Sequence, residues 1–228
     1  MNNIIKMLVA TGTKLILGFF TMALGSVIII NCIIGVAPWD VLHQGLSLVF
    51  SIGVGRAQIY TGIIIVTLDV LLGQNIGWAT ILNMFGIGMF VDLLMFNNLV
   101  PDFSGLMIIY KLALIIIGIC LQGLGTYFYI STGYGAGPRD GLMVALSRKL
   151  NKPFGLVKSV VEVLVVGTGY LLGGNFGVGT LIMAFLAGHI WQFMYDKMGF
   201  NISAINHRFI EDDIRFLKEK FQKEETPE

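Results

Sequence analysis

Six long apolar runs, separated by short polar segments, dominate the pattern of this 228-residue chain. A run of about 20 apolar residues is long enough for a helix that crosses a bilayer. The runs cover residues 15–34, 59–72, 78–96, 106–130, 157–172 and 178–194. Those at 59–72 and 157–172 need flanking residues to reach spanning length. The pattern therefore predicts an all-α membrane protein that crosses the bilayer several times.

The same pattern occurs twice, because the chain matches itself when it is shifted by 100 residues. Between segments 18–95 and 118–195, 20 of 78 aligned positions are identical and no gap is needed. Duplication inside a membrane is how many transporters build a central site between two related halves. We therefore expect two tandem repeats in one membrane domain, followed by a tail. The expected bounds are 1–196 for the membrane domain, about 14–96 and 107–196 for the repeats, and 197–228 for the tail.

Each repeat also contains a short segment that fits a spanning helix poorly. In the second repeat, the uncharged stretch between the charged residues at the two ends of this segment is only the seven residues 141–147. Seven helical residues rise about 10 Å, against a hydrocarbon core of about 30 Å. The equivalent segment of the first repeat carries three residues that are costly to expose to lipid, Asp40, His43 and Gln44. We predict that residues 38–50 and 138–150 form re-entrant or broken helices, shielded from lipid by their neighbours.

The distribution of basic residues indicates how the repeats are oriented. If the short segments turn back, each repeat crosses three times and the repeats are inverted; if they cross, the repeats are parallel. The linker after the second short segment carries Arg148, Lys149, Lys152 and Lys158, whereas its counterpart, residues 51–58, contains only Arg56. Because basic residues gather on the cytoplasmic side, this difference favours inverted repeats with both termini cytoplasmic. Parallel repeats are the alternative, since Lys111 and Arg56 would suit cytoplasmic positions.

A Gly-x-x-Pro-x-Asp-x-Leu motif recurs at residues 35–42 and 135–142. With the related segments Gly77-Trp-Ala-Thr80 and Gly177-Val-Gly-Thr180, this pair resembles the YczE/YitT-like family of bacterial integral membrane proteins. The resemblance extends over about residues 14–200. It implies a bacterial inner-membrane location and a multi-pass fold, and it implies no particular substrate.

The repeated motif is typical of the first turn of a helix. Proline there loses no hydrogen bond, because its missing N–H would be unpaired, and the preceding glycines permit a sharp turn. The residues with these roles are Gly35, Pro38, Gly135 and Pro138. The aspartate two residues later lies where the helix dipole stabilises a negative charge. Asp40 and Asp140 can therefore cap their helices, or line a polar cavity where two helix starts meet near the membrane centre, or do both.

The two motifs differ at the position between proline and aspartate, where Trp39 corresponds to Arg139. A guanidinium at membrane depth needs a partner. We hypothesise that Arg139 pairs with Asp40 or Asp140 in one state of a transport cycle, or binds an anionic substrate group; the alternative is a solvated arginine on the cytoplasmic side. The candidate residues for substrate binding or gating are Trp39, Asp40, His43, Gln44, Thr80, Arg139, Asp140 and Thr180.

Several other residues in the apolar runs have simpler interpretations. Lys158 and Glu162 are four residues apart, which predicts a local ion pair on one helix face. Asp69 and Asp92 lie near the ends of their runs, which favours positions at the membrane interface. Glycines recur in both repeats at positions that suit close helix packing: Gly18, Gly25 and Gly88, with Gly118, Gly125 and Gly188.

The composition narrows the classes of function. The mean hydropathy is +0.80 and the net charge only +1, without a basic patch for nucleic acid. The sequence contains no zinc-protease motif, phosphate loop or cysteine pair, so we expect neither an enzyme nor a metal or cofactor site. We expect a permease for a small polar or ionic solute, in contact with the lipid bilayer. The alternative is a non-transporting protein that assembles with its own copies or with a membrane-protein partner.

The tail changes character after Asn206. Apolar residues recur at helical spacing among charged ones, at Ile210, Ile214, Leu217 and Phe221. This spacing predicts an amphipathic helix between Asn206 and Lys223, on the cytoplasmic face.

Overall fold

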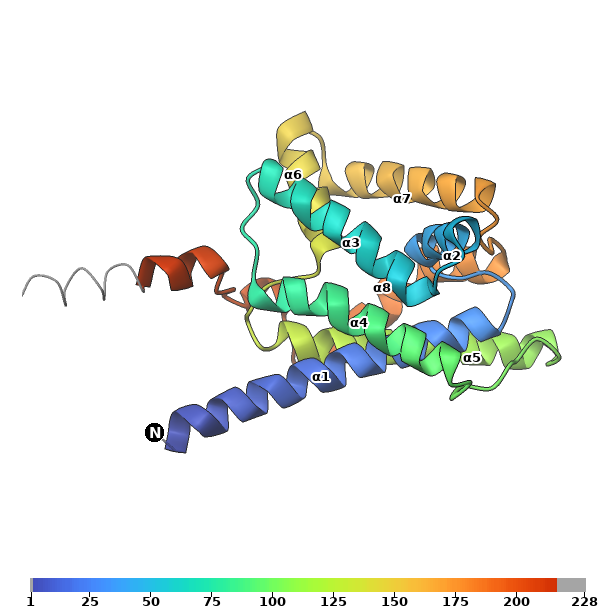
Figure 1. Cartoon of the computed structure of the whole chain (residues 1–228), viewed down its shortest axis with the longest axis horizontal. Coiled ribbons are helices and arrows are strands. Elements are labelled where there is room, and N and C mark those ends of the chain that lie inside the picture. Colours follow the sequence, from blue (N-terminus) through green and yellow to red (C-terminus); the bar gives the residue numbers. More distant parts are fainter. Residues whose placement is uncertain (1, 217–228) are drawn as a thin grey trace, which may run out of the picture.

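The computed structural model describes residues 2–216. The α-helices are α1 (Asn2–Asn31), α2 (Pro38–Phe50), α3 (Val54–Leu71), α4 (Trp78–Phe96), α5 (Ile108–Ile130), α6 (Pro138–Leu150), α7 (Phe154–Leu171) and α8 (Val178–Lys197), followed by a short 3-10 helix at Ile202–Ala204. Within the described residues, six helices are long and apolar enough to cross a membrane: α1, α3, α4, α5, α7 and α8. The prediction of an all-α protein with several spanning helices is confirmed (Figure 1).

The two short helices, α2 and α6, are continuous and contain 13 residues each. A helix of this length rises about 20 Å and cannot cross a hydrocarbon core of about 30 Å. Each begins with the motif proline and is followed by a residue in the left-handed conformation, Ser51 (φ 53°) or Asn151 (φ 52°). The short segments are therefore intact short helices rather than helices broken at glycine.

Helices α1 and α5 form the most extensive contact between two helices of the described chain. Gly18 lies against Gly125 and Gly25 lies against Gly118, so closely that a Cβ atom on Gly25 would be 2.6 Å from the carbonyl oxygen of Gly118. Residue numbers rise along one helix and fall along the other at these contacts. The two helices are therefore antiparallel, as Figure 1 also shows.

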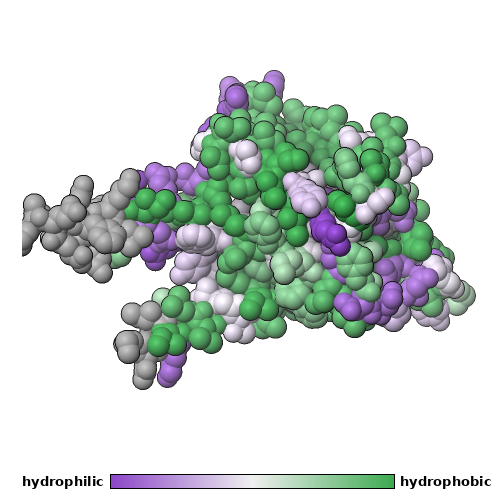
Figure 2. All heavy atoms as spheres, viewed as in Figure 1, coloured by the Kyte–Doolittle hydropathy of each residue, from purple (hydrophilic) through white to green (hydrophobic). Residues whose placement is uncertain are grey.

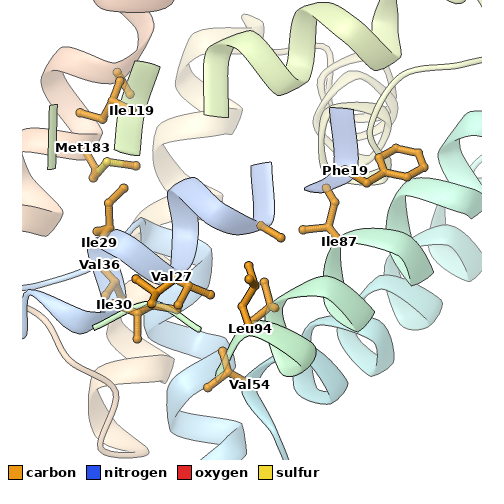
Figure 3. Close-up of a cluster of buried hydrophobic side chains, with 14 of the residues drawn as sticks. Phe19, Val27, Ile29, Ile30, Val36, Val54, Ile87, Leu94, Ile119 and Met183 are labelled. Carbon is orange, nitrogen blue, oxygen red and sulfur yellow. The ribbon is translucent and has the colours of Figure 1, made fainter. Parts of the chain in front are cut away.

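The apolar core surrounds α1, which packs against both α4 and α5. Figure 3 shows part of this cluster, including Phe19 and Val27 of α1, Ile87 of α4 and Met183 of α8. The outer surface is also apolar: hydrophobic atoms cover most of the face in Figure 2, and hydrophilic atoms gather near the end of α6 and along the loop between α4 and α5. An apolar exterior of this extent is expected for helices that contact lipid.

The two aspartates near the ends of apolar runs have different environments. Asp92 accepts hydrogen bonds from the backbone N–H groups of Gly55 (2.7 Å) and Arg56 (3.1 Å) at the start of α3. Asp69 is fully buried, because α6 covers it: a Cβ atom on Gly141 would be 3.0 Å from its Oδ2. Asp69 is thus covered by protein rather than by lipid or solvent, and its predicted position at the membrane interface stays a prediction.

The segment after α8 folds back over the loops that precede α4 and α6. The N–H of Arg208 donates to the carbonyl of Gly133 (2.7 Å), and the N–H of Ile210 donates to the carbonyl of Ile76 (2.9 Å). The indole N–H of Trp78 donates to Asp213 (2.9 Å). Residues 210–216 are helical. Residues 206–209 are not helical, so the helix begins later than predicted. The part of the predicted amphipathic helix after residue 216 lies outside the described residues and stays a prediction.

Candidate functional site

A cavity of about 540 Å³ lies where the starts of α2 and α6 face each other. Its wall includes side chains from all six spanning helices and from both short helices. Trp39 and Asp40 of α2 line it, as do Arg139 and Asp140 of α6. The structure therefore brings the variable and acidic positions of both motifs to one place.

On the α2 side, the aspartate is largely covered and has one close partner. Asp40 is 7% exposed, and its Oδ1 lies 3.2 Å from Nδ1 of His43, one helical turn later. His43 is fully buried behind Asp40, and its Nε2 has no hydrogen-bond partner among the described residues. His43 thus supports the cavity wall through Asp40 without lining the cavity.

On the α6 side, the charged groups are more open. The carboxylate of Asp140 is exposed to the cavity, and Arg139 is half-buried. The Cζ atom of Arg139 lies 5.1 Å from the ring centroid of Trp39, within the range of a cation–π interaction. The negative charges of Asp40 and Asp140 stabilise the positive charge of the guanidinium. In the described part of the chain, however, no ion pair within 4.0 Å joins Arg139 to a carboxylate. In this conformation Arg139 therefore stacks on Trp39.

Three other candidate residues form hydrogen bonds to backbone groups in the loops and first turns near the helix starts. Oε1 of Gln44 accepts the N–H of Asn175 (3.0 Å), and the hydroxyl of Thr80 donates to the carbonyl of Ala136 (2.7 Å). The hydroxyl of Thr180 accepts the N–H of Gly177 (3.3 Å), within its own first turn. Among residues 2–216, the cavity lining includes none of these three side chains.

The motif glycines hold these loops in place from the other half of the chain. Gly35 (φ +107°) lies against the start of α8, and Gly135 (φ +117°) lies against the start of α4. The N–H of Gly179 donates to the carbonyl of Ile34 (2.7 Å), and the equivalent N–H of Ala79 donates to the carbonyl of Tyr134 (2.9 Å). Because left-handed backbone favours glycine, these two positions explain why each motif begins with glycine.

Most of the polar residues in the cavity wall were not among the candidates predicted from the sequence. They come from five spanning helices: Ser26, Gln58, Thr61, Asn83, Gln122, Thr126, His189 and Gln192. Gln122 donates to the hydroxyl of Ser26 (2.8 Å), which links α5 to α1. Only their spacing could have indicated these residues from the sequence, because pairs such as Gln122 and Thr126 are four residues apart and share a helix face.

The predicted ion pair between Lys158 and Glu162 is present, with Nζ and Oε1 separated by 3.9 Å. Both side chains also line the cavity. With the four motif residues, the wall thus carries two cationic groups, Arg139 and Lys158, and three carboxylates, Asp40, Asp140 and Glu162. Opposite charges and polar amides around one cavity suit a small polar or ionic ligand better than an apolar one.

The fold and this cavity define a multi-pass membrane protein with charged residues enclosed by its helices. The chain belongs to the family described as "Family of unknown function (DUF6198)", whose sequence profile matches residues 11–196. It is 34% identical to the "Uncharacterized membrane protein YczE" of Bacillus subtilis over 183 residues, which cover 77% of this chain and 81% of YczE. The resemblance to YczE-like bacterial membrane proteins is therefore confirmed.

Two further relatives are similar over nearly the same share of the chain. An "Uncharacterized protein" of Haemophilus influenzae is 31% identical over 172 residues, which cover 75% of this chain and 77% of that protein. The "Uncharacterized protein YyaS" of Bacillus subtilis is 26% identical over 176 residues, which cover 75% of this chain and 86% of YyaS. No solved structure matches the chain. The similarity to YczE supports a membrane location, and the function is inferred from the cavity.

Proposed function

We propose that this protein is a permease or transporter that binds a small polar or ionic solute in the cavity between α2 and α6. The observation that carries the proposal is the convergence of Asp40, Arg139 and Asp140 on one cavity inside a bundle of spanning helices. Charged side chains at membrane depth are costly, and they usually mark the path of a substrate or an ion.

The arrangement of the helices supports two inverted repeats around this site. The helices α2, α3 and α4 begin at residues 38, 54 and 78, and α6, α7 and α8 begin 100 residues later, at 138, 154 and 178. The equivalent helices α1 and α5 are antiparallel. Transporters built from inverted repeats commonly place short helices with their N-termini at the central site. On this proposal α2 and α6 enter from opposite sides, and both termini are on the cytoplasmic side of the inner membrane.

Binding and translocation suit the cavity better than catalysis does. Its amides and hydroxyls lie on several helices, around charged groups that themselves come from both repeats. Such a distribution lets the two halves hold one solute from two sides and release it when they move apart. We therefore do not expect an enzyme.

Flux measurements on the purified protein in liposomes test the proposal. The panel comprises radiolabelled amino acids, sugars and small organic acids, with a pH-sensitive dye inside the liposomes to detect proton movement. We expect uptake of at least one solute, reduced about tenfold or more by Asp140→Asn, because one charged contact to a ligand contributes more than about 1.4 kcal/mol in a site of low dielectric constant.

Asp102→Asn is the control, because Asp102 is exposed in the loop between α4 and α5 and lies outside the cavity lining. It should leave uptake unchanged. Absence of flux across the panel, together with a membrane protein that co-purifies in fixed stoichiometry, would instead favour the role of a non-transporting partner.

A further inference from the structure

The two repeats differ in how their last two helices pack. In the first repeat α3 packs against α4, whereas the equivalent helices α7 and α8 make almost no contact between their described residues. The cavity wall at this separation carries Lys158 and Glu162 from α7, and His189 and Gln192 from α8. We call the contact between α3 and α4 the first seam, and the separation between α7 and α8 the second seam.

A pair of glycines lets the first seam close. Gly55 and Gly88 are buried, and each backbone lies against the other: a Cβ atom on Gly88 would be 2.5 Å from the carbonyl oxygen of Gly55. Their counterparts in the second repeat are also glycines, Gly155 and Gly188. Both are exposed, and within the described residues no atom lies within 4 Å of where their Cβ atoms would be.

Nothing in this conformation requires glycine at 155 or 188. Both positions lie inside helices, where glycine is less stable than alanine, and neither has a positive φ. In the first seam, the facing pair of glycines lets two helix backbones touch. The glycines of the second seam fit a contact that this conformation does not make.

Building on the proposed function, we propose that α7 closes onto α8 through Gly155 and Gly188 in a second conformation, while α3 separates from α4. The cavity would then open through the second seam in one conformation and through the first seam in the other. Because inverted repeats place these seams towards opposite sides of the membrane, the exchange gives a solute access from each side in turn.

Side-chain sizes across the two seams support this exchange. In the first seam the side chain of Met84 fills the space beside Gly62, where a Cβ atom would be within 3.0 Å of its sulfur. At the equivalent positions of the second seam the large and small residues are reversed, with Ala184 opposite Glu162. A closed second seam therefore has room for Glu162, which would remain beside its partner Lys158.

A difference at one further position explains which seam is closed here. In the first seam the carboxylate of Asp92 binds the N–H groups at the start of α3, and it lies 3.5 Å from Arg56. Its counterpart, Gln192, donates to Asp196 of its own helix (2.7 Å). A carboxylate at a helix start is stabilised by the helix dipole, and a neutral amide gains much less. The first seam is thus the more firmly held, as observed.

Cysteine accessibility tests the exchange without knowledge of the solute. The background replaces Cys32 and Cys120 with alanine. The reporters are Ile59→Cys, whose side chain contacts Gly88 in the first seam, and Ser159→Cys, its counterpart in the second seam. A membrane-impermeant maleimide is applied from each side of the membrane, and labelling rates are compared with and without Gly188→Leu.

Leucine at 188 has open space in the present conformation but would block closure of the second seam. We expect labelling of Ile59→Cys to fall about tenfold or more, because overpacking a closed contact shifts the population by at least that factor. Labelling of Ser159→Cys should stay the same or rise. Unchanged labelling of Ile59→Cys would overturn the proposal.

The matched control is Gly167→Leu. Gly167 is an exposed glycine of α7, also with open space around it, and its counterpart Thr67 is exposed in the closed first repeat. It should leave both labelling rates unchanged. An effect of Gly167→Leu equal to that of Gly188→Leu would contradict a specific glycine contact.

As a converse test, Asp92→Asn should raise the labelling rate of Ile59→Cys severalfold and lower that of Ser159→Cys. The opposite shifts would contradict the exchange.

Labelling and flux separate the two proposals. If Gly188→Leu changes the labelling rates as expected but no solute moves, the result supports the exchange and rejects the transport function. Flux with labelling rates that Gly188→Leu leaves unchanged would retain the transport function and reject the exchange.

Discussion

Individual charges inside the helix bundle differ in how well they are compensated. Asp92 receives two backbone N–H groups and Arg56, and Asp40 has His43 as a neighbour. Asp69 is fully buried, and neither of its oxygens has a hydrogen-bond partner among the described residues. A buried carboxylate without partners costs folding free energy, whereas a well-placed one at a helix start contributes to it. The same chemical change should therefore have opposite effects at Asp69 and Asp92.

We expect Asp69→Asn to raise the free energy of unfolding by about 1 kcal/mol or more above neutral pH, because it removes a buried carboxylate that no described residue compensates. Asp92→Asn should lower it by about 1–2 kcal/mol, because it weakens the bonds to the start of α3. Thermal unfolding of both variants in the same detergent measures the two changes. A shift of both midpoints in the same direction would contradict this account of their environments.

At the scale of the helices, most bounds could be predicted closely and the cavity only in part. The exception is α1, which begins at Asn2, well before the apolar run at 15–34. The length of an apolar run and the prolines that start helices are local signals, so the prediction for residues 78–96 matches α4. The motif residues Asp40 and Arg139 could be placed at a helix start for the same reason. Gln58, Asn83 and Gln122 could not be assigned to the cavity, because Gln58 lies just before an apolar run and the other two lie within mostly apolar runs. Which face points inward depends on packing between the repeats, and so does the burial of Asp69 under α6.

The glycine contacts between α1 and α5 lead to a prediction for these helices. A side chain on Gly25 would clash with the backbone of α5, so Gly25→Leu should cost about 3 kcal/mol or more, or prevent folding. Gly12 lies on the same helix and has no described atom within 4 Å of a Cβ position. Gly12→Leu should therefore change stability by less than about 0.5 kcal/mol. The yield of monodisperse protein and its unfolding temperature are the measurements, and equal losses at both positions would contradict the close approach.

At the scale of the whole molecule, two physically independent features support the proposed inverted repeats. One is the excess of basic residues in the linker after α6, which reflects how a chain is oriented during insertion. The other is the antiparallel packing of the equivalent helices α1 and α5, which reflects steric fit at Gly18, Gly25, Gly118 and Gly125. Figure 1 shows the N-terminal end of α1 and residues 210–216 at the same end of the molecule, as an even number of crossings requires.

The loop between α4 and α5 distinguishes the two orientations directly. Three crossings place this loop outside the cell, whereas four crossings place it in the cytoplasm. In the cysteine-free background, we expect an impermeant maleimide to label Ser104→Cys in intact cells, because Ser104 is exposed in this loop. Lys152→Cys is the control, since both arrangements place the linker after α6 in the cytoplasm, and it should react only in inverted vesicles. Labelling of Ser104→Cys from the cytoplasmic side alone would reject the inverted repeats. The same result would reject the entry of α2 and α6 from opposite sides of the membrane. Alternating access to Asp40 and Asp140 depends on that arrangement.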